Sequence, residues 1–247
     1  MNTNIKGIAL RTVRHNDRTS ILSVFTAEMG RVSVVMPAGN GKESRRLKAL
    51  TMPMGLFEGN VTVRQNQELL FIRDIKGWGP GGMRPDVSSN ALKSAVAMFI
   101  AEVIYVTTRD NAPDSFLWNL VVETAFTLSV CSGRELTNLP AAFLFRLAGV
   151  VGIAPDFAEY NFNTGLDMKE GVFRVTRPMH DYWLSPLAAR CAFTFSKTIH
   201  DYSHLSLIHF NRHIRNELID NTLRFFSLHN FPLDKIKSLD ILRTIFA

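Results

Sequence analysis

The chain has 247 residues, of which 46% are hydrophobic and 20% charged, and its formal net charge is +6. This balance supports a buried core of one large or two modest domains, and it excludes an intrinsically disordered chain. No apolar run reaches the ~18 residues that a membrane helix needs, and the N-terminal segment shows no signal-peptide core. Cys131 and Cys191 are the only cysteines. We therefore expect a reduced, cytoplasmic protein without a membrane span or a disulfide framework.

The excess positive charge lies in the first third of the chain. Residues 1–84 contain 13 Lys and Arg against 6 Asp and Glu, a balance of +7, and the remaining 15 basic and 16 acidic residues give −1. This asymmetry predicts a module that binds a polyanion, joined to an electrostatically neutral body. A charged surface that only keeps the protein in solution is the alternative.

Short β-rich runs separated by turns dominate the first 78 residues. The predicted strands cover residues 5–13, 21–25, 32–35, 52–64 and 69–72. Met29-Gly30 forms the turn between the second and third strands, and Gly55 and Gly59 suggest the bends of a closed barrel. Five such strands predict an OB-like β-barrel over residues 1–78.

A cationic, glycine-punctuated loop is predicted at residues 39–48, where Glu43 is the single acid. A flexible loop dense in cations suits a polyanion whose backbone must be followed. We expect nucleic acid to contact the cations of this loop and of the strands around it. They are Arg11, Arg14, Arg18, Arg31, Lys42, Arg45, Arg46, Lys48 and Arg64.

Aromatic residues are few among these cations. Phe25, Phe57 and Phe71 lie in strand patterns, and we expect them in the core. Without aromatic platforms for the bases, binding should go through the phosphate backbone, blind to sequence and strongly dependent on salt.

Glycine and proline then mark a linker, predicted at residues 79–85, and helical periodicity follows over residues 86–247. The predicted helices cover residues 86–108, 114–130, 139–152, 187–193, 205–228 and 238–246. Asn138 is the predicted cap of the third helix, with Pro140 in its first turn. Residues 156–183 lack this periodicity and predict a loop with a short hairpin at 165–175.

Two histidine pairs raise the possibility of a metal site. His200 and His204, and likewise His209 and His213, stand four residues apart, a spacing that can place two zinc ligands on one helix face. An ordinary amphipathic helix with histidines on its wet side is the simpler interpretation. A metal-dependent enzyme that acts on nucleic acid through these histidines stays open as an alternative.

Other catalytic patterns are missing. A P-loop needs a glycine where Met36 stands and a Ser or Thr where Glu43 stands. The sequence has no G-x-S-x-G, and neither cysteine lies in a nucleophile setting. The carboxylates of Asp167 and Glu170 lie in loop-like sequence, where we expect solvated charges.

The order of these parts resembles the bacterial recombination mediator family RecO. The resemblance is carried by residues 7–11, 21–26, Gly30-Arg31, Ala38-Gly39 with Lys42 and Ser44, residues 50–53, the helix 212–224 followed by His229, and residues 237–243. It implies an α+β multidomain fold, with a five-stranded OB-like β-barrel followed by an all-α helical domain. It also implies a protein without catalytic residues or cofactors.

The resemblance further implies a DNA repair and recombination function. RecO-like proteins bind single- and double-stranded DNA and anneal complementary strands. They work with RecR and with the C-terminal tail of single-strand-binding protein, so that RecA can load, which implies a nucleoid-associated location. An RNA-binding OB protein stays an alternative, because nothing in the sequence reads a 2′-hydroxyl.

The chain departs from the family pattern in two places. Many members carry a four-cysteine zinc module that residues 156–191 cannot form, because Cys191 is their only cysteine. We therefore expect no metal there. The turn His15-Asn16-Asp17 lacks the family's usual Gly-Glu.

An acidic tail that ends in apolar residues needs a hydrophobic pocket rimmed by cations. Arg212, Arg215 and Arg224 are possible rims, and that site stays unassigned.

Overall fold

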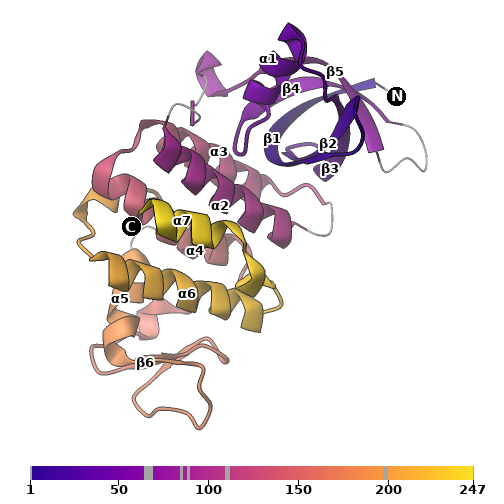
Figure 1. The fold of residues 1–247 in the computed structure, drawn as a ribbon. Helices are drawn as coiled ribbons and strands as arrows, with labels where there is room; N and C mark the ends of the chain where they lie inside the picture. Colours follow the sequence, from indigo (N-terminus) through magenta and orange to yellow (C-terminus); the bar gives the residue numbers. More distant parts are fainter. Residues whose placement is uncertain are drawn as a thin grey trace. The chain divides into compact units, whose positions relative to one another are not determined.

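The computed structural model of the chain describes residues 2–63, 69–83, 86–87, 90–108, 112–196 and 200–246. Spatial contacts divide the chain into two compact units (Figure 1). The first unit comprises Met1–Val130 and Ser238–Ile245, and the second comprises Cys131–Lys237 with the last two residues. The domain boundaries predicted at residues 79–85 stay a prediction, since this grouping by contacts places the barrel and several later helices together.

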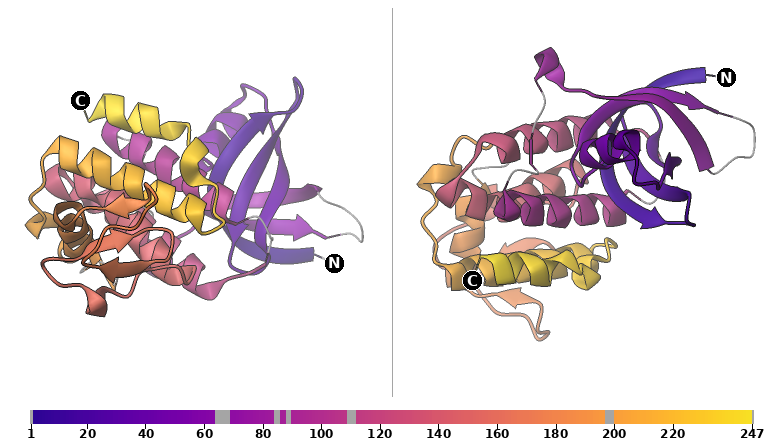
Figure 2. Two further views of the ribbon diagram at one scale, coloured as in Figure 1. Left: turned by 90° about the horizontal axis from the view of Figure 1, so that it is seen from below. Right: turned by 45° about the horizontal axis from the view of Figure 1, so that its top comes forward.

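A closed five-stranded barrel forms the N-terminal part of the first unit. Its strands are β1 (Asn2–Arg14), β2 (Thr19–Thr26), β3 (Gly30–Pro37), β4 (Leu56–Thr62) and β5 (Leu69–Gly77). They close in the order β1-β2-β3-β5-β4, with β3 and β5 parallel and the other pairs antiparallel. Figure 2 shows the barrel from two further sides. The predicted OB-like barrel is confirmed.

Alternation along the strands decides what the barrel buries. Ile5, Leu22 and Phe57 have no exposed surface and lie in the barrel core. The expectation for Phe71 is wrong, because 54% of its surface is exposed. Leu70 faces the core, and successive side chains of a strand point to opposite faces, so Phe71 must point outward.

The predicted basic loop is wrong in its conformation, because Lys42–Leu50 forms a helix, α1. The segment consists mostly of good helix formers, which outweigh the glycines before it. Leu47 is 7% exposed and joins the barrel core, while the charged residues lie on the other face. The cations are therefore presented by a helix at one end of the barrel (Figures 1 and 2).

Three further helices complete the first unit: α2 (Ala91–Thr107), α3 (Ser115–Val130) and α7 (Ser238–Ile245). Asn90 caps α2 by accepting a hydrogen bond from the Leu92 N–H. α7 packs against α2, where Ser238 donates from its N–H and its hydroxyl to the Glu102 carboxylate at 2.8 and 2.6 Å. The three helices predicted in these regions are confirmed, although α2 begins five residues later than expected.

The second unit contains α4 (Gly133–Val150), α5 (Pro186–Ser196) and α6 (Arg212–Leu228). A small sheet of order β7-β6-β8 accompanies them, built from β6 (Gly165–Asp167), β7 (Val172–Arg174) and β8 (Trp183–Leu184). The hairpin expected at residues 165–175 is thus confirmed. Among the described residues, no helix is both long and apolar enough to span a membrane.

Two helix starts in this unit differ from the prediction. Asn138 is not a cap, because α4 begins at Gly133 and contains Pro140 in its interior. The fully buried Asn138 amide instead donates to the carbonyls of Leu205 and Ile208, both at 3.0 Å. These bonds hold residues 205–208 outside a regular helix, so α6 begins only at Arg212, where Asn211 caps it.

Candidate nucleic-acid interface

Cations without partners gather where α1 closes one end of the barrel. Arg18, Lys42 and Arg45 are exposed, and within the described part of the chain none of them has an ion-pair or hydrogen-bond partner for its side chain. The backbone brings them together, because the Ala38 N–H donates to the Arg18 carbonyl at 2.9 Å. From Ala38 the chain runs through residues 39–41 directly into α1.

Other cations at the same end are tied to neighbours. Arg46 donates to both carboxylate oxygens of Glu43, at 2.9 and 2.6 Å, and to the Ile75 carbonyl at 3.0 Å. The hydrogen bonds from Arg46 lower the pKa of the Glu43 carboxyl and raise that of the guanidinium. Lys48 donates to the Gly39 carbonyl at 3.2 Å.

Arg14 is likewise engaged, since it pairs with Asp17 at 2.7 Å in the turn after β1. Both side chains are largely exposed, at 71% and 96%, so the pair leaves Arg14 open to a phosphate that displaces the carboxylate. Beside this turn lies a groove of about 290 Å³. Thr12, Ser20, Met36, Pro37, Leu47, Lys48, Thr51, Met52 and Pro53 line it.

Arg11 and Arg31 both contact an aromatic residue of α2. Both guanidinium groups lie near the ring of Tyr105 on α2, at 5.8 and 4.7 Å from its centroid, and Arg31 also donates to the Tyr105 carbonyl. Arg31 is half-buried and joins the barrel to α2. Arg64, the last of the expected contacts, lies outside the described residues.

The arrangement suits electrostatic contact with a phosphate backbone. Guanidinium and ammonium groups on one helix and one adjoining turn can each meet a phosphate, and such contacts position a strand without reading its sequence. Where Asp17 and Glu43 pair with arginines, they reduce the local charge without burying it.

Comparison of the amino-acid sequence with known proteins finds similarity to one family throughout. Residues 1–79 match the family described as Recombination protein O N terminal. The chain is 28% identical over 243 residues to the DNA repair protein RecO of Phocaeicola vulgatus, covering 98% of each chain. It is 28% identical over 245 residues to DNA repair protein RecO of Porphyromonas gingivalis, again covering 98% of each. A shorter match, 26% over 163 residues, links it to DNA repair protein RecO of Bacillus subtilis, covering 63% of this chain and 58% of that protein.

Residues 1–79 thus match the N-terminal domain of the RecO family, and nearly the whole chain is similar to DNA repair proteins RecO. This similarity supports a function in DNA repair and recombination.

The histidines of the chain are not arranged as the metal hypothesis requires. His200, His204 and His209 precede α6, so neither pair shares a face of one helix. His209 instead contacts the Arg134 guanidinium at 3.2 Å. Within the described ranges, no group of three or more His, Cys, Asp or Glu side chains is placed to hold a metal ion.

An ionic cluster lies in the segment where the RecO resemblance implies a zinc module in many other members. Asp167 was expected to be solvated, but it is only 2% exposed. Its carboxylate lies 3.5 Å from Arg174 and 3.3 Å from His180, and it accepts hydrogen bonds from the N–H groups of Lys169 and Glu170. These contacts tie the β6–β7 hairpin together.

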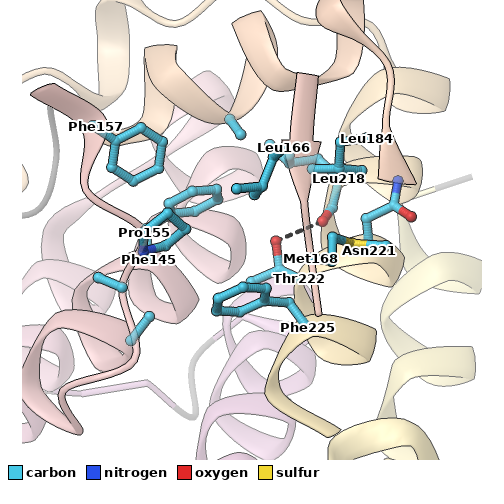
Figure 3. A pocket seen from close by; sticks show the side chains of 13 residues that line it. Phe145, Pro155, Phe157, Leu166, Met168, Leu184, Leu218, Asn221, Thr222 and Phe225 are labelled. Atoms are coloured by element: carbon cyan, nitrogen blue, oxygen red, sulfur yellow. Dashed lines mark hydrogen bonds between the residues drawn. The ribbon is translucent and has the colours of Figure 1, made fainter. Parts of the chain in front are cut away.

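An apolar pocket lies in the second unit, between α4, α6 and the small sheet (Figure 3). Phe145, Phe157, Leu166, Met168, Leu218 and Phe225 account for much of its lining. Its free volume is about 30 Å³, and its lining is almost entirely apolar. No Arg or Lys lines it, so it does not meet the requirements for an acidic tail.

The possible rim residues on α6 are also occupied. Arg215 donates to the Phe210 carbonyl, and burial lowers the pKa of its guanidinium. Arg224 lies over the Tyr182 ring at 4.6 Å from its centroid. The site for a partner's acidic tail therefore stays unassigned.

Cysteine chemistry adds nothing to the site. Cys131 is 2% exposed, as expected of a core residue. Cys191 is half-buried, and burial raises the pKa of its thiol, which disfavours the reactive thiolate.

Sequence reasoning missed two residues beside the predicted interface, Phe71 and Tyr105. Strand alternation could have identified Phe71 as outward-facing.

Proposed function

We propose that this chain binds single- and double-stranded DNA through the cations at the α1 end of the barrel, and that it anneals complementary strands. In this proposal it also helps to load RecA onto single-stranded DNA coated by single-strand-binding protein. Its partners in that step are a RecR-like protein and the C-terminal tail of single-strand-binding protein.

The observation that carries the proposal is the set of three exposed cations, Arg18, Lys42 and Arg45, that have no partner within the described residues. They belong to the segment that holds the whole positive excess of the chain. Such charges cost little to bring to a phosphate, because no intramolecular bond must first be broken. Binding through them releases counterions from DNA and depends steeply on salt.

Reversal of two of these charges tests the proposal. The variant Lys42→Glu/Arg45→Glu should bind a single-stranded oligonucleotide and a duplex at least about tenfold more weakly at ~0.1 M salt. The slope of log affinity against log salt should fall by roughly 2, because two phosphate contacts are lost. Fluorescence anisotropy over a salt series measures both quantities.

A matched control separates this effect from net charge alone. Lys169→Glu/Lys235→Glu makes the same charge change at exposed positions of the second unit. It should lower the affinity less than threefold and leave the slope unchanged. Equal losses in both variants would show that only overall charge matters, and would count against an interface at α1.

Annealing is tested with complementary strands coated by single-strand-binding protein. The wild-type chain should accelerate annealing, and the α1 double variant should not. The same assay with RNA strands addresses the RNA-binding alternative, since a preference for RNA over DNA of the same sequence would favour it. A single-strand-binding protein that lacks its C-terminal tail tests that partner, and loss of the acceleration is expected.

A further inference from the structure

Phe71 is an aromatic side chain that the barrel leaves in solvent. It lies on β5 with 54% of its surface exposed, although its neighbour Leu70 is 4% exposed and belongs to the barrel core. Exposing a phenyl ring on a regular strand forfeits the burial that usually stabilises it. The position therefore invites a functional explanation.

The strand register places Phe71 in a row of apolar side chains across the outer face. Phe71 pairs with Val35 on β3, Val35 with Ile21 on β2, and Ile21 with Val13 on β1. Val13 is 46% exposed, and Ile21 and Val35 are half-buried. The row runs across four neighbouring strands of a closed barrel, so it offers side chains and no free strand edge.

Other parts of the same outer face are covered. Phe25 on β2 is 1% exposed, because Trp118 of α3 packs over it with ring centroids 6.2 Å apart. Its cross-strand partner Arg31 is held by Tyr105 of α2. The fold thus covers one aromatic residue of this face and leaves Phe71 uncovered.

Cations flank the open row. Arg73 stands two residues beyond Phe71 on the same strand, is exposed, and has no side-chain partner within the described residues. Arg11 stands two residues before Val13 and is also exposed, with its guanidinium 5.8 Å from the centroid of the Tyr105 ring. Positive groups beside an exposed ring match a ligand that has both anionic groups and flat apolar surfaces.

We propose that Phe71 is a stacking platform for a base of single-stranded nucleic acid, with the backbone held by the flanking arginines. The inference rests on the proposed function and deepens it. Only a single strand can offer a base face to the ring, because duplex bases already stack on one another. Phe71 is therefore a determinant of preference for single strands, whereas the cations of α1 serve both forms.

Substitution of the ring tests this role. Phe71→Ala should weaken binding of an oligothymidylate about tenfold and change duplex affinity less than twofold. The salt slope should stay the same, because no phosphate contact is lost. Phe71→Tyr, which keeps the ring, should bind like the wild type. Phe116→Ala removes a ring that is 76% exposed on α3, and it should have no effect.

A second readout reports stacking directly. Phe71→Trp should show tryptophan emission that oligothymidylate quenches and duplex does not, measured against the wild-type chain with its three native tryptophans. Circular dichroism verifies that each variant is folded.

The outcomes separate the two proposals. Equal losses for single strand and duplex in Phe71→Ala, or no loss for either, would overturn the stacking role while wild-type binding still supports the proposed function. Absence of nucleic-acid binding by the wild type at low salt would overturn both. If Phe71→Ala binds DNA normally and loses only a protein partner, the row is a protein-docking surface and the inference is wrong.

Discussion

Arginines are used differently in the two units. At the α1 end of the barrel, Arg18 and Arg45 reach solvent without partners within the described residues. In the second unit, Arg146 is 9% exposed, donates to the His200 carbonyl at 3.1 Å and lies 4.4 Å from the centre of the Tyr202 ring. These arginines of the first unit are thus open to a partner, whereas Arg146 of the second unit is used for internal packing. A binding surface is distinguished by exposed cations that have no intramolecular partner, more than by the number of cations.

The largest effect is expected for Arg146→Ala. It removes a hydrogen bond from a buried charged group and a cation–π contact, so the free energy of unfolding should fall by about 3 kcal/mol. Urea denaturation measures the change. Arg190→Ala is the control, because Arg190 is exposed and, in the part of the chain that the structure describes, its side chain contacts just the Phe162 ring, at 5.0 Å from its centroid. If the Arg146→Ala protein stays folded but binds DNA more weakly, the assignment of Arg146 to internal packing alone is wrong.

A smaller loss is expected for Asp167→Asn. The amide keeps the shape of the buried carboxylate but loses its charge toward Arg174 and His180, which should cost about 2 kcal/mol of unfolding free energy. Asp181→Asn is the matched control, since Asp181 is 90% exposed in its pair with Arg177. Its effect should be near zero. Equal stabilities of the two variants in thermal unfolding would contradict a structural role for the ionic cluster.

Within the first unit, Arg31→Met should separate packing from recognition. It removes the contacts with Tyr105, so stability should fall by about 1 kcal/mol while DNA affinity changes less than twofold. Arg45→Met should show the reverse pattern. Parallel urea titrations and anisotropy measurements compare the two variants. A greater affinity loss in Arg31→Met would return Arg31 to the interface.

The smallest effect is a gain. Glu43→Gln frees Arg46 from its ion pair, so DNA affinity should rise about twofold and the salt slope should increase slightly. Because Arg46 holds the pKa of Glu43 below its usual range, the carboxylate stays charged as pH falls from 7 to about 5. The DNA affinity of the wild type should therefore not rise through protonation of Glu43 between pH 7 and about 5. An unchanged affinity in the variant would show that Arg46 does not contact DNA.

The barrel could be predicted because its information is local. Alternation of period two and the Met29-Gly30 turn are visible in short windows of sequence, and Gly30 indeed has a φ of +66°. The helix α1 was missed because the glycines before it and its charge resemble a loop, while Leu47, its one buried side chain, gives little periodic signal.

Partnership of side chains was the part that sequence could not provide. The expected cations are present, but Arg31 bonds a carbonyl 74 residues away, and Asn138 bonds carbonyls 67 and 70 residues away. Such contacts depend on tertiary packing and leave no pattern in a window of sequence. The Glu43–Arg46 pair, three residues apart, could be recognised only once the segment was known to be helical.

The packing of α7 on α2 has a consequence for how the protein is made. All of residues 131–237 must leave the ribosome between α3 and α7, which takes on the order of ten seconds at typical translation rates. During that time the hydrogen bond from Ser238 to the Glu102 carboxylate cannot form, and the surface of α2 on which α7 and its buried Leu242 later pack stays exposed to solvent. The nascent first unit therefore exposes the α7-binding surface of α2 until its final helix has been synthesised.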